Sequence, residues 1–369
     1  MDMIDPRYMH LAIDLAKKGA GYTSPNPLVG AVLVKDGTVI GRGYHARYGE
    51  FHAERNALSD CAAQGKNPAG ATMYVTLEPC CHYGKQAPCT DAIIAAKITR
   101  VVVGSADPNP LVSGKGCAKL RAAGIEVIEG FLKEYCDPLN KIFFYFIKNK
   151  LPYIACKYAM TLDGKIATKS GKSKWISGKS AREFVHHLRT QYTAIMIGSQ
   201  TAIIDNPELS SHGAGRNPVR IICDTNLRTP LENTLVKTAG EIKTIFATAT
   251  NDTKRIASFE QRGCEVLPVP QAGDQLDLQE LLKLLAAQNI DSILVEGGGT
   301  LHYSLFKAAL VQKLYAFIAA KIFGGVNAKT PVEGDGIDNV EDAFRLQDIC
   351  VQKLGDDFLL EGDVIPVSK

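Results

Sequence analysis

Short runs of β-branched and aliphatic residues alternate along almost the whole chain with segments of helical apolar spacing. RVVVG at 100–104 is one such run, and RYMHLAIDLAKK at 7–18 is a segment of the second kind. This alternation predicts an α/β protein in which helices cover the faces of a sheet. Because 369 residues are about twice the usual length of a single domain, we expect two such domains.

The first domain is expected to cover residues 1–149 as a compact α/β sandwich. Asp36-Gly37 joins the two β-branched runs of GAVLVKDGTVIGRGYH, which strongly predicts a hairpin. The remaining expected elements are strands at 72–77, 100–104 and 125–130, helices at 7–18, 52–64, 89–97 and 114–123, and a closing helix within 139–152.

The second domain is expected to cover residues 150–369 as another α/β unit, built on a mostly parallel sheet. Its last segment, FRLQDICVQKLGDDFLLEGDV, has the pattern of a hairpin with Gly355-Asp356 at the turn. The expected strands lie at 152–160, 193–198, 219–224, 242–247, 264–268, 291–296 and 313–321, and the expected helices at 178–190, 276–288 and 300–309.

Composition excludes several classes of protein. The 42 basic and 39 acidic residues give a net charge of only +3, so we expect no nucleic-acid partner, which would require a concentrated positive face. No uncharged apolar run approaches the ~20 residues that span a bilayer, so we expect no membrane association. The start of the chain, MDMIDPRYMH, lacks the pattern of a signal peptide, and a cytoplasmic protein is therefore expected.

Most of the ten cysteines are scattered and are expected to be reduced and buried, but PCCHYGKQAPC at 79–89 gathers three of them with a histidine. His52-Ala53-Glu54 opens a predicted helix upstream of this cluster. A histidine, then x-Glu, then Pro-Cys and a later Cys is the zinc-deaminase arrangement. We therefore predict that His52, Cys80 and Cys89 bind zinc, with Cys81 and His82 as neighbours that are rival ligands.

These residue types suit hydrolytic deamination. Two thiolates and one imidazole hold zinc while leaving the fourth tetrahedral position for water, whose pKa the metal lowers to about 7. Glu54 is the predicted general base and acid. Glu54 and His52 would diverge on a continuous helix, so they converge only at its first turn. A structural zinc site, or buried cysteines without a metal, is the competing interpretation.

The chain resembles the bifunctional riboflavin-biosynthesis pyrimidine deaminase/reductase family over nearly its whole length. The matching motifs in the first domain are PNPLVG at 25–30, His52-Ala53-Glu54, residues 79–89 and DPNP at 107–110. Eight residues separate Cys80 from Cys89, where the general zinc-deaminase pattern has two, and this insertion is a feature of the family. The resemblance implies a cytidine-deaminase-like α/β/α sandwich followed by a dihydrofolate-reductase-like α/β domain.

The resemblance also implies two reactions. Zinc-dependent deamination of 2,5-diamino-6-ribosylamino-4(3H)-pyrimidinone 5′-phosphate would precede reduction of the ribosyl side chain to ribityl by NADPH. In the first domain it implies a set of residues that hold the pyrimidine and its ribose phosphate. Gln86-Ala87 departs from the usual Thr-Pro of the family beside these contacts. The implied substrate-binding residues are Asn26, His45, Lys85, Asp107 and Asn109.

The second domain carries KYAMTLDG at 157–164, SKWI at 173–176 and ILVEGGGTLHYSLF at 293–306. No G-x-G-x-x-G follows a strand, but the three glycines ahead of a helix start form a candidate phosphate cradle. Lys157 is the predicted catalytic cation, with Asp205 and Glu296 nearby, and a structural salt bridge is the alternative for all three. The resemblance implies NADPH contacts from Ala159, Trp175, Thr201, Asp205, Thr225, Gly298, Gly299, Thr300 and Leu301, and substrate contacts from Ser173, Arg189, Leu209, His212 and Glu296.

His212 stands where family members often have arginine, so its grip on phosphate would depend on protonation. The family resemblance also implies a homo-oligomer. Two other functions remain as alternatives at this point: a nucleic-acid deaminase with an appended domain, and a zinc-stabilised module that binds NADPH without turnover.

Overall fold

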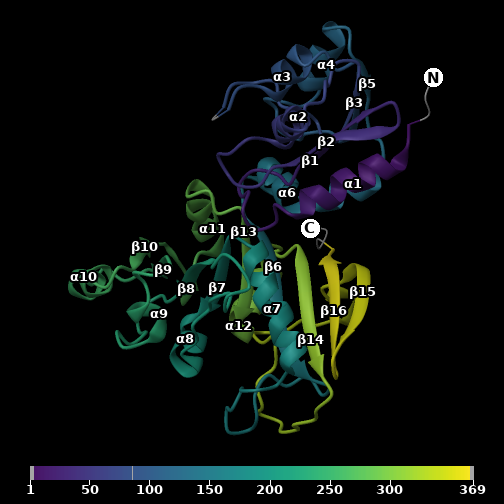
Figure 1. Ribbon diagram of the computed structural model, residues 1–369. Helices are drawn as coiled ribbons and strands as arrows, with labels where there is room; N and C mark the ends of the chain where they lie inside the picture. Colours follow the sequence, from purple (N-terminus) through teal and green to yellow (C-terminus); the bar gives the residue numbers. More distant parts are fainter. Residues whose placement is uncertain (1–3, 85, 366–369) are drawn as a thin grey trace. The chain divides into compact units, whose positions relative to one another are not determined.

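The computed structural model describes residues 4–84 and 86–365, and it divides into two units between Lys150 and Leu151 (Figure 1). This division lies one residue beyond the boundary that the sequence suggests after Asn149. Each unit has its own sheet and its own hydrophobic core, and the two are described separately.

The first unit contains a five-stranded sheet of order β2-β1-β3-β4-β5. Strand β1 pairs antiparallel with β2 and β3, whereas β3, β4 and β5 run parallel. The strands are β1 (Gly30–Lys35), β2 (Thr38–Tyr44), β3 (Thr72–Leu77), β4 (Arg100–Ser105) and β5 (Glu126–Ile128), and the helices are α1 (Pro6–Lys17), α2 (Ala53–Ala63), α3 (Cys89–Ala95), α4 (Lys115–Ala122), α5 (Lys133–Cys136), the 3₁₀ turn η1 (Asp137–Asn140) and α6 (Lys141–Asn149).

Alternate residues of each strand enter two different cores, as the two-residue period of a strand requires. Leu33 of β1 packs in one core with residues of α2, α3 and α4, while its neighbour Val32 packs in the other with residues of α1. The first unit is therefore an α/β/α sandwich. Asp36 and Gly37 both have positive φ at the turn between β1 and β2, which confirms the predicted hairpin.

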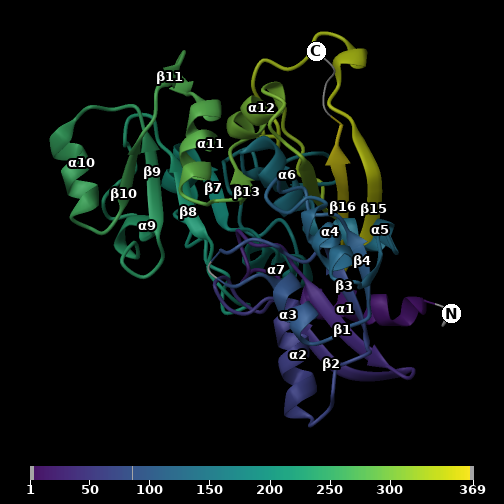
Figure 2. The same cartoon turned by 90° about the horizontal axis from the view of Figure 1, so that it is seen from above.

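The second unit contains a nine-stranded sheet of order β10-β9-β8-β7-β13-β6-β14-β16-β15 (Figure 1; all but β6 and β14 are labelled in Figure 2). Its strands run parallel from β10 to β14, and β16 and β15 complete it as an antiparallel hairpin. The strands are β6 (Tyr153–Thr161), β7 (Ala194–Gly198), β8 (Val219–Cys223), β9 (Thr244–Thr248), β10 (Glu265–Pro268), β13 (Ser292–Gly297), β14 (Lys313–Ala319), β15 (Leu346–Leu354) and β16 (Asp357–Val364); a separate small hairpin is made of β11 (Gln271–Ala272) and β12 (Gln275–Leu276).

Helices cover both faces of this sheet. Residues of α11 (Leu278–Ala287) and α12 (Gly299–Lys307) enter one core, and residues of α8 (Ser199–Asp205), α9 (Thr234–Lys237) and α10 (Thr253–Glu260) enter another. Helix α7 (Lys179–Gln191) packs Phe184 against Phe317 of β14. A further 3₁₀ turn, η2, spans Val340–Asp342.

Helices α8, α9 and α10 are absent from the sequence-based assignment. The first two are short, and α8 contains β-branched residues, which lower helix propensity. Helix α10 had a usable signal, because Asp252 caps it by accepting a hydrogen bond from the Arg255 amide.

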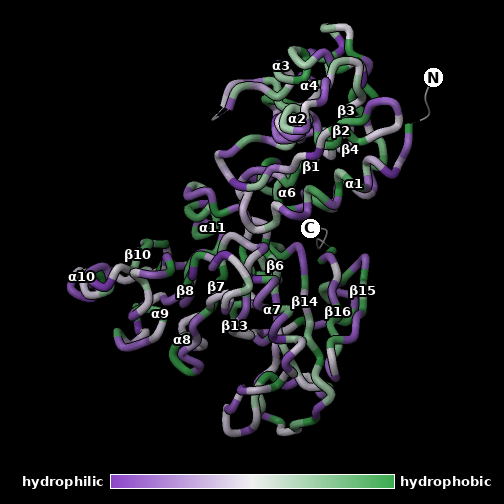
Figure 3. The backbone as a smooth tube through the Cα atoms, in the orientation of Figure 1, coloured by the Kyte–Doolittle hydropathy of each residue, from purple (hydrophilic) through white to green (hydrophobic). Residues whose placement is uncertain are grey.

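Hydropathy follows the layers only in part. Hydrophobic and hydrophilic residues are mixed along β15, whose residues are mostly exposed (Figure 3). In the described ranges, no helix combines the length and the apolar character needed to cross a membrane.

Candidate active sites

The first unit has a cavity of about 220 Å³ where β3 and β4 end. Because these strands are parallel neighbours, their carboxyl ends lie at the same edge of the sheet. Cys80 follows β3 and Asp107 follows β4, and both line the cavity. His52 and Glu54 reach it from the start of α2.

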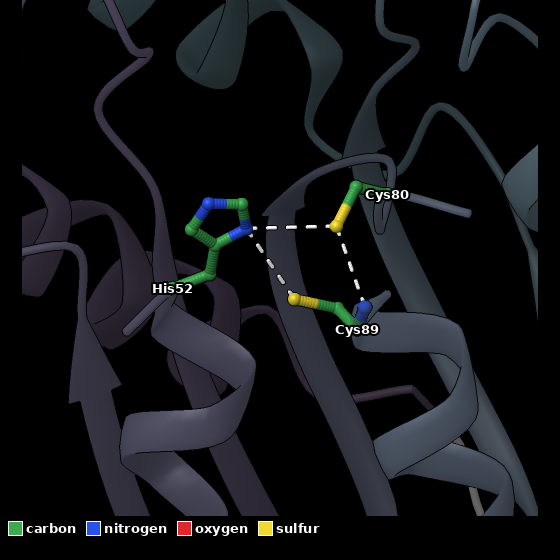
Figure 4. A group of neighbouring side chains, drawn as sticks. All are labelled: His52, Cys80 and Cys89. Carbon is green, nitrogen blue, oxygen red and sulfur yellow. Dashed lines mark hydrogen bonds between the residues drawn. The ribbon is translucent and has the colours of Figure 1, made fainter. Parts of the chain in front are cut away.

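His52, Cys80 and Cys89 point toward one another in this cavity region (Figure 4). Their candidate donor atoms all lie within 4.8 Å of one another. The Nδ1 atom of His52 is 3.5 Å from the sulfur of Cys80 and 3.5 Å from that of Cys89. The chemistry of the set, two thiols and one imidazole, fits zinc with one coordination position left for a non-protein ligand.

Helix starts bring these side chains together. His52 is the extended N-cap residue of α2, so it stands outside the helix while Glu54 lies in the first turn. This change of backbone direction lets residues two apart converge. Cys89 is the first residue of α3, as predicted, and its amide donates to the Cys80 sulfur at 3.3 Å.

The electrostatics of the site favour one thiolate and a proton-carrying glutamate. Hydrogen bonds from Cys89 and then from His52 lower the pKa of Cys80 to about 4, against the effect of burial. Burial, followed by the nearby Cys80 thiolate, raises the pKa of Glu54 to about 6. Glu54 can therefore take up and release a proton near neutral pH.

Neither rival ligand belongs to the group of donor atoms. The Cys81 sulfur contacts the carbonyl oxygen of Leu111 at 3.7 Å. His82 lines the cavity, but its buried Nδ1 has no hydrogen-bond partner among the described residues, and it is not part of the ligand group.

Predicted substrate residues also line the cavity. His45 Nδ1 donates to the Phe51 carbonyl oxygen at 3.1 Å, which leaves Nε2 to accept from the Asn26 amide nitrogen at 3.2 Å. Burial lowers the pKa of His45, so the neutral form that this pattern needs is favoured. The His45 ring meets the His52 ring edge to face, with centroids 5.2 Å apart.

Asp107 and Asn109 line the same cavity. The Asp107 carboxylate accepts from the Asn109 amide at 2.8 Å, and burial raises its pKa to about 6. Gln86, at one departure from the family pattern, donates to the Gly49 carbonyl oxygen at 3.0 Å. Lys85, the remaining predicted contact, lies outside the described residues.

In the second unit, Glu296 at the end of β13 lies between two cations. Arg189 binds its carboxylate with two hydrogen bonds, of 2.6 and 2.8 Å, and Lys157 of β6 is 3.6 Å from Oε2. Burial alone would raise the pKa of Glu296, but Arg189 and then Lys157 lower it to about 2. Burial lowers the pKa of Lys157, and Glu296 opposes this effect.

Asp205 has a different partner from the one its predicted role suggests. It accepts a hydrogen bond from the Ser173 hydroxyl at 2.9 Å, whereas Lys157 pairs with Glu296. Asp205 ends α8, and Thr201 of the same helix packs against the glycine turn after β13. A Cβ atom at Gly297 would lie 2.9 Å from the Thr201 methyl carbon, so these two predicted cofactor segments are in direct contact.

The glycine turn leads directly into α12. Gly298 is the N-cap residue, with a φ of 94° that favours glycine, and Gly299 and Thr300 begin the helix. The amides of this first turn can bind phosphate. Leu301 packs in the core beneath the turn, so only its backbone is available to a ligand.

Other predicted contacts have different surroundings. Leu209 is buried in the core that includes residues of α8. Trp175 is 67% exposed and stacks on the Arg182 guanidinium, 4.5 Å from the ring centroid. Ala159 lies on β6, and the Thr225 carbonyl oxygen after β8 accepts from the Ala249 amide.

His212 lies beside a second histidine. The His212 and His186 rings stack with centroids 4.3 Å apart, and His212 Nδ1 is 3.9 Å from a Glu208 carboxylate oxygen. His186 is on α7, one turn before Arg189.

Two family models match the chain. Residues 152–360 match the RibD C-terminal domain, and residues 3–105 match the cytidine and deoxycytidylate deaminase zinc-binding region. The Actinobacillus pleuropneumoniae riboflavin biosynthesis protein RibD is 50% identical over 364 residues, which cover 98% of this chain and 96% of that protein. The Escherichia coli K12 protein RibD is 38% identical, covering 97% of this chain and 99% of the relative.

The chain belongs to the RibD family. It is therefore a bifunctional deaminase and reductase of riboflavin biosynthesis, with a zinc-binding deaminase domain and an NADPH-dependent reductase domain. The fold class expected from the sequence is confirmed.

Solved structures of the RibD family agree with this fold. A Thermotoga maritima diaminohydroxyphosphoribosylaminopyrimidine deaminase/5-amino-6-(5-phosphoribosylamino)uracil reductase has a TM-score of 0.86 at 37% identity, covering 97% of this chain and 98% of its own. Acinetobacter baumannii RibD has a TM-score of 0.87 at 34% identity, covering 98% of both chains.

Three residues beside the two candidate sites of this RibD chain were not singled out by the motifs: His186 in the second unit, and Glu78 and Asn140 in the first. His186 could have been found from its i, i+3 spacing to Arg189 on a predicted helix. Glu78 and Asn140 had no comparable signal, because both act on backbone groups distant in sequence. Asn140 binds the Leu28 amide and carbonyl, at 2.8 and 2.9 Å, beside the Asn26 wall of the cavity.

Proposed function

We propose that the first unit deaminates 2,5-diamino-6-ribosylamino-4(3H)-pyrimidinone 5′-phosphate and that the second reduces the ribosyl side chain of the product to ribityl. One observation carries the first half: three zinc-type donors gather around one point, with a buried, proton-accepting Glu54 beside them. Membership of the RibD family supports the pathway.

His52, Cys80 and Cys89 would hold the zinc. When bound, zinc supplies a water acidic enough to be deprotonated near neutral pH. Glu54 takes that proton and delivers it to the pyrimidine ring nitrogen as the water oxygen bonds to the ring carbon. It then moves the second proton, from the hydroxyl group now on that carbon, to the amino group, which leaves as ammonia while the carbonyl forms. Its burial keeps bulk water from competing for the proton, and its raised pKa of about 6 suits both the acid and the base role.

The cavity supplies groups for the polar edge of the pyrimidine and for the ribose phosphate. Asn26, which bonds to neutral His45, offers a donor, and Asp107, which accepts from the Asn109 amide, offers acceptors. A ring carrying amino and carbonyl groups needs both kinds of partner. Lys85 is proposed as the phosphate contact.

In the second unit, Lys157 is proposed to polarise the C1′ electrophile of the ribosyl chain. When bound, NADPH supplies the hydride. Glu296 stabilises the Lys157 cation, and Arg189 fixes Glu296 through two parallel hydrogen bonds, which also limits its rotation. Ser173 and His212 are the other proposed substrate contacts, and Leu209 would contribute through its backbone.

The proposed cofactor site combines the glycine turn with α8. The first-turn amides at Gly299 and Thr300 would bind the NADPH phosphates. Thr201 packs on that turn, and Asp205 of the same helix accepts a hydrogen bond from Ser173. Helix α8 therefore contributes to both the proposed cofactor site and the proposed substrate site of the second unit. Ala159, Trp175, Thr225 and the backbone of Leu301 are the remaining proposed contacts.

A coupled assay tests the function directly. The full chain, given the diaminopyrimidine ribotide, should release ammonia, and added NADPH should then be oxidised. Zinc removal by a chelator should stop the ammonia release and leave NADPH oxidation of pre-deaminated substrate intact. NADPH binding without oxidation would favour the non-catalytic module, and activity on cytosine in single-stranded nucleic acid would favour the editing enzyme.

We also propose a homo-oligomer acting in the cytoplasm. Exposed Ile349 and Val351 on edge strand β15 offer apolar surface for a second copy. Ten free thiols, three of them in the zinc cluster region, suit a reducing compartment. Light scattering, with a charged substitution at Val351 as the matched variant, tests the assembly, and cell fractionation tests the compartment.

A further inference from the structure

Glu78 is buried beside the deaminase cavity, between strand β3 and the Cys80 ligand, and is 4% exposed. Its own amide donates to the Ser105 carbonyl oxygen at 2.9 Å, which extends the pairing of β3 with β4 by one step. The backbone at this position is therefore fixed by the sheet.

In the part of the chain that the structure describes, four backbone amides of the segment that follows β4 donate hydrogen bonds to the Glu78 carboxylate. One oxygen accepts from the amides of Asp107, at 3.4 Å, and Gly114, at 3.0 Å. The other accepts from Gly116, at 3.0 Å, and Cys117, at 3.2 Å. Both ends of the 107–117 segment are thus tied to one side chain.

A carboxylate has about four acceptor positions, so these amides use its full capacity. Glu78 lines the cavity, but it keeps no acceptor for a substrate. It is therefore distinct from Asp107, whose carboxylate accepts from the Asn109 amide and, among the described residues, has acceptor capacity left for a ligand.

The other side of the tied segment is also closely packed. A Cβ atom at Gly116 would lie 2.1 Å from the Pro79 carbonyl oxygen, so the start of α4 rests on the backbone next to Cys80. The segment carrying Asp107 and Asn109 is held between the sheet and the metal-ligand turn, and Glu78 is the polar group that fixes it there.

We propose that Glu78 is a positioning residue for deamination, which sets the place of Asp107 and Asn109 relative to the zinc ligands. This role rests on the proposed function of the first unit. Glu78 affects binding of the pyrimidine ribotide, because the residues that it orders are proposed substrate contacts. The proton carrier Glu54 lies on α2, outside the 107–117 segment.

Glu78→Gln in the full, zinc-loaded chain tests this role. The amide nitrogen of glutamine cannot accept a hydrogen bond, so two of the four bonds are lost while size is kept. We expect the deaminase KM to rise roughly tenfold and kcat to fall less than about threefold, with zinc content and NADPH oxidation of pre-deaminated substrate unchanged. Glu129→Gln, at an exposed glutamate paired with Arg121, is the control and should change none of these.

A double-mutant cycle separates positioning from general stability. If Glu78 acts through Asp107, Glu78→Gln should raise KM much less in an Asp107→Asn background than in the wild type. Glu78→Asp keeps both oxygens on a shorter side chain, and it should give an intermediate KM even where the glutamine variant folds poorly.

Three results would overturn the role: a wild-type KM in Glu78→Gln and Glu78→Asp, effects that add fully to Asp107→Asn, or loss of zinc in both Glu78 variants. A wild-type chain that releases no ammonia from the ribotide overturns the proposed function and this role with it. An active wild type with unaffected variants overturns the role alone.

Discussion

The two sites of this chain are built in different ways. In the first unit, the metal donors come from one histidine and a single eleven-residue segment, and their sulfur and nitrogen atoms already lie within 4.8 Å. In the second, the proposed site draws on β6, α7, α8 and β13, and its centre is a buried ion pair network. The first depends on a bound ion and the second on charge balance. Substitutions should therefore separate the two activities.

The largest expected effect is at Glu54. Glu54→Gln removes the proton carrier, so deamination should fall by about 10²–10⁴-fold, while zinc content and NADPH oxidation with pre-deaminated substrate stay at wild-type levels. Ammonia release and metal analysis measure the two quantities. Full deaminase activity in this variant would remove the catalytic assignment, and a parallel loss of reduction would contradict the separation of the sites.

The converse variant is Lys157→Ala. Loss of the cation next to C1′ should slow NADPH oxidation by about 10²-fold, because electrostatic stabilisation of the reacting centre is lost. Glu296 keeps its two bonds to Arg189, so the melting temperature should change little. Ammonia release should be unchanged. Normal NADPH oxidation would reduce Lys157 to a structural partner of Glu296.

A smaller effect is expected from pH. Burial raises the pKa of Asp107 to about 6, so its carboxylate is mostly ionised at pH 7 and mostly protonated at pH 5. Protonation removes an acceptor, and the deaminase KM should rise by roughly tenfold between pH 7 and pH 5. Asp107→Asn should have a high KM that is flat across this window. Zinc content at pH 5 must be checked, and a flat wild-type KM would contradict the role of Asp107.

The smallest expected effect concerns His212. His212→Arg supplies a permanent cation at the position where the family often has one, so the reductase KM should fall by about two- to fivefold. His187→Arg, on the exposed side of α7, is the matched control. Equal effects of the two substitutions would indicate general electrostatic attraction rather than a contact.

The sequence predicted the first site better than the second for a physical reason. Zinc requires particular donor atoms, so His52, Cys80 and Cys89 are visible as residue types, and helix starts bring them together. The second site is made of charged and hydrophobic side chains, which also form salt bridges and cores throughout a protein, so their residue types do not mark a site. Nothing in the sequence distinguishes Leu209 in a core from Leu209 at a ligand, or shows that Asp205 pairs with Ser173 while Glu296 pairs with Lys157.

Most of the fold, but not all of its helices, could be predicted from the sequence. Alternating apolar patterns located the principal strands, and paired turn residues located both long hairpins. Helix α8 was missed because tertiary packing overrides its weak propensity. Glu78 was missed because its partners are backbone amides, which every residue possesses and which no motif records.

The placement of His52 at the entrance of α2 and of Cys89 at the entrance of α3 has a consequence for the living cell. A single ion bound there would join two helices and the turn between β3 and α3, whereas the second unit has its own core and, within residues 151–365, no comparable group of metal donors. Under zinc starvation the reductase unit would stay folded and active but would receive no deaminated substrate. The diaminopyrimidine ribotide would then accumulate.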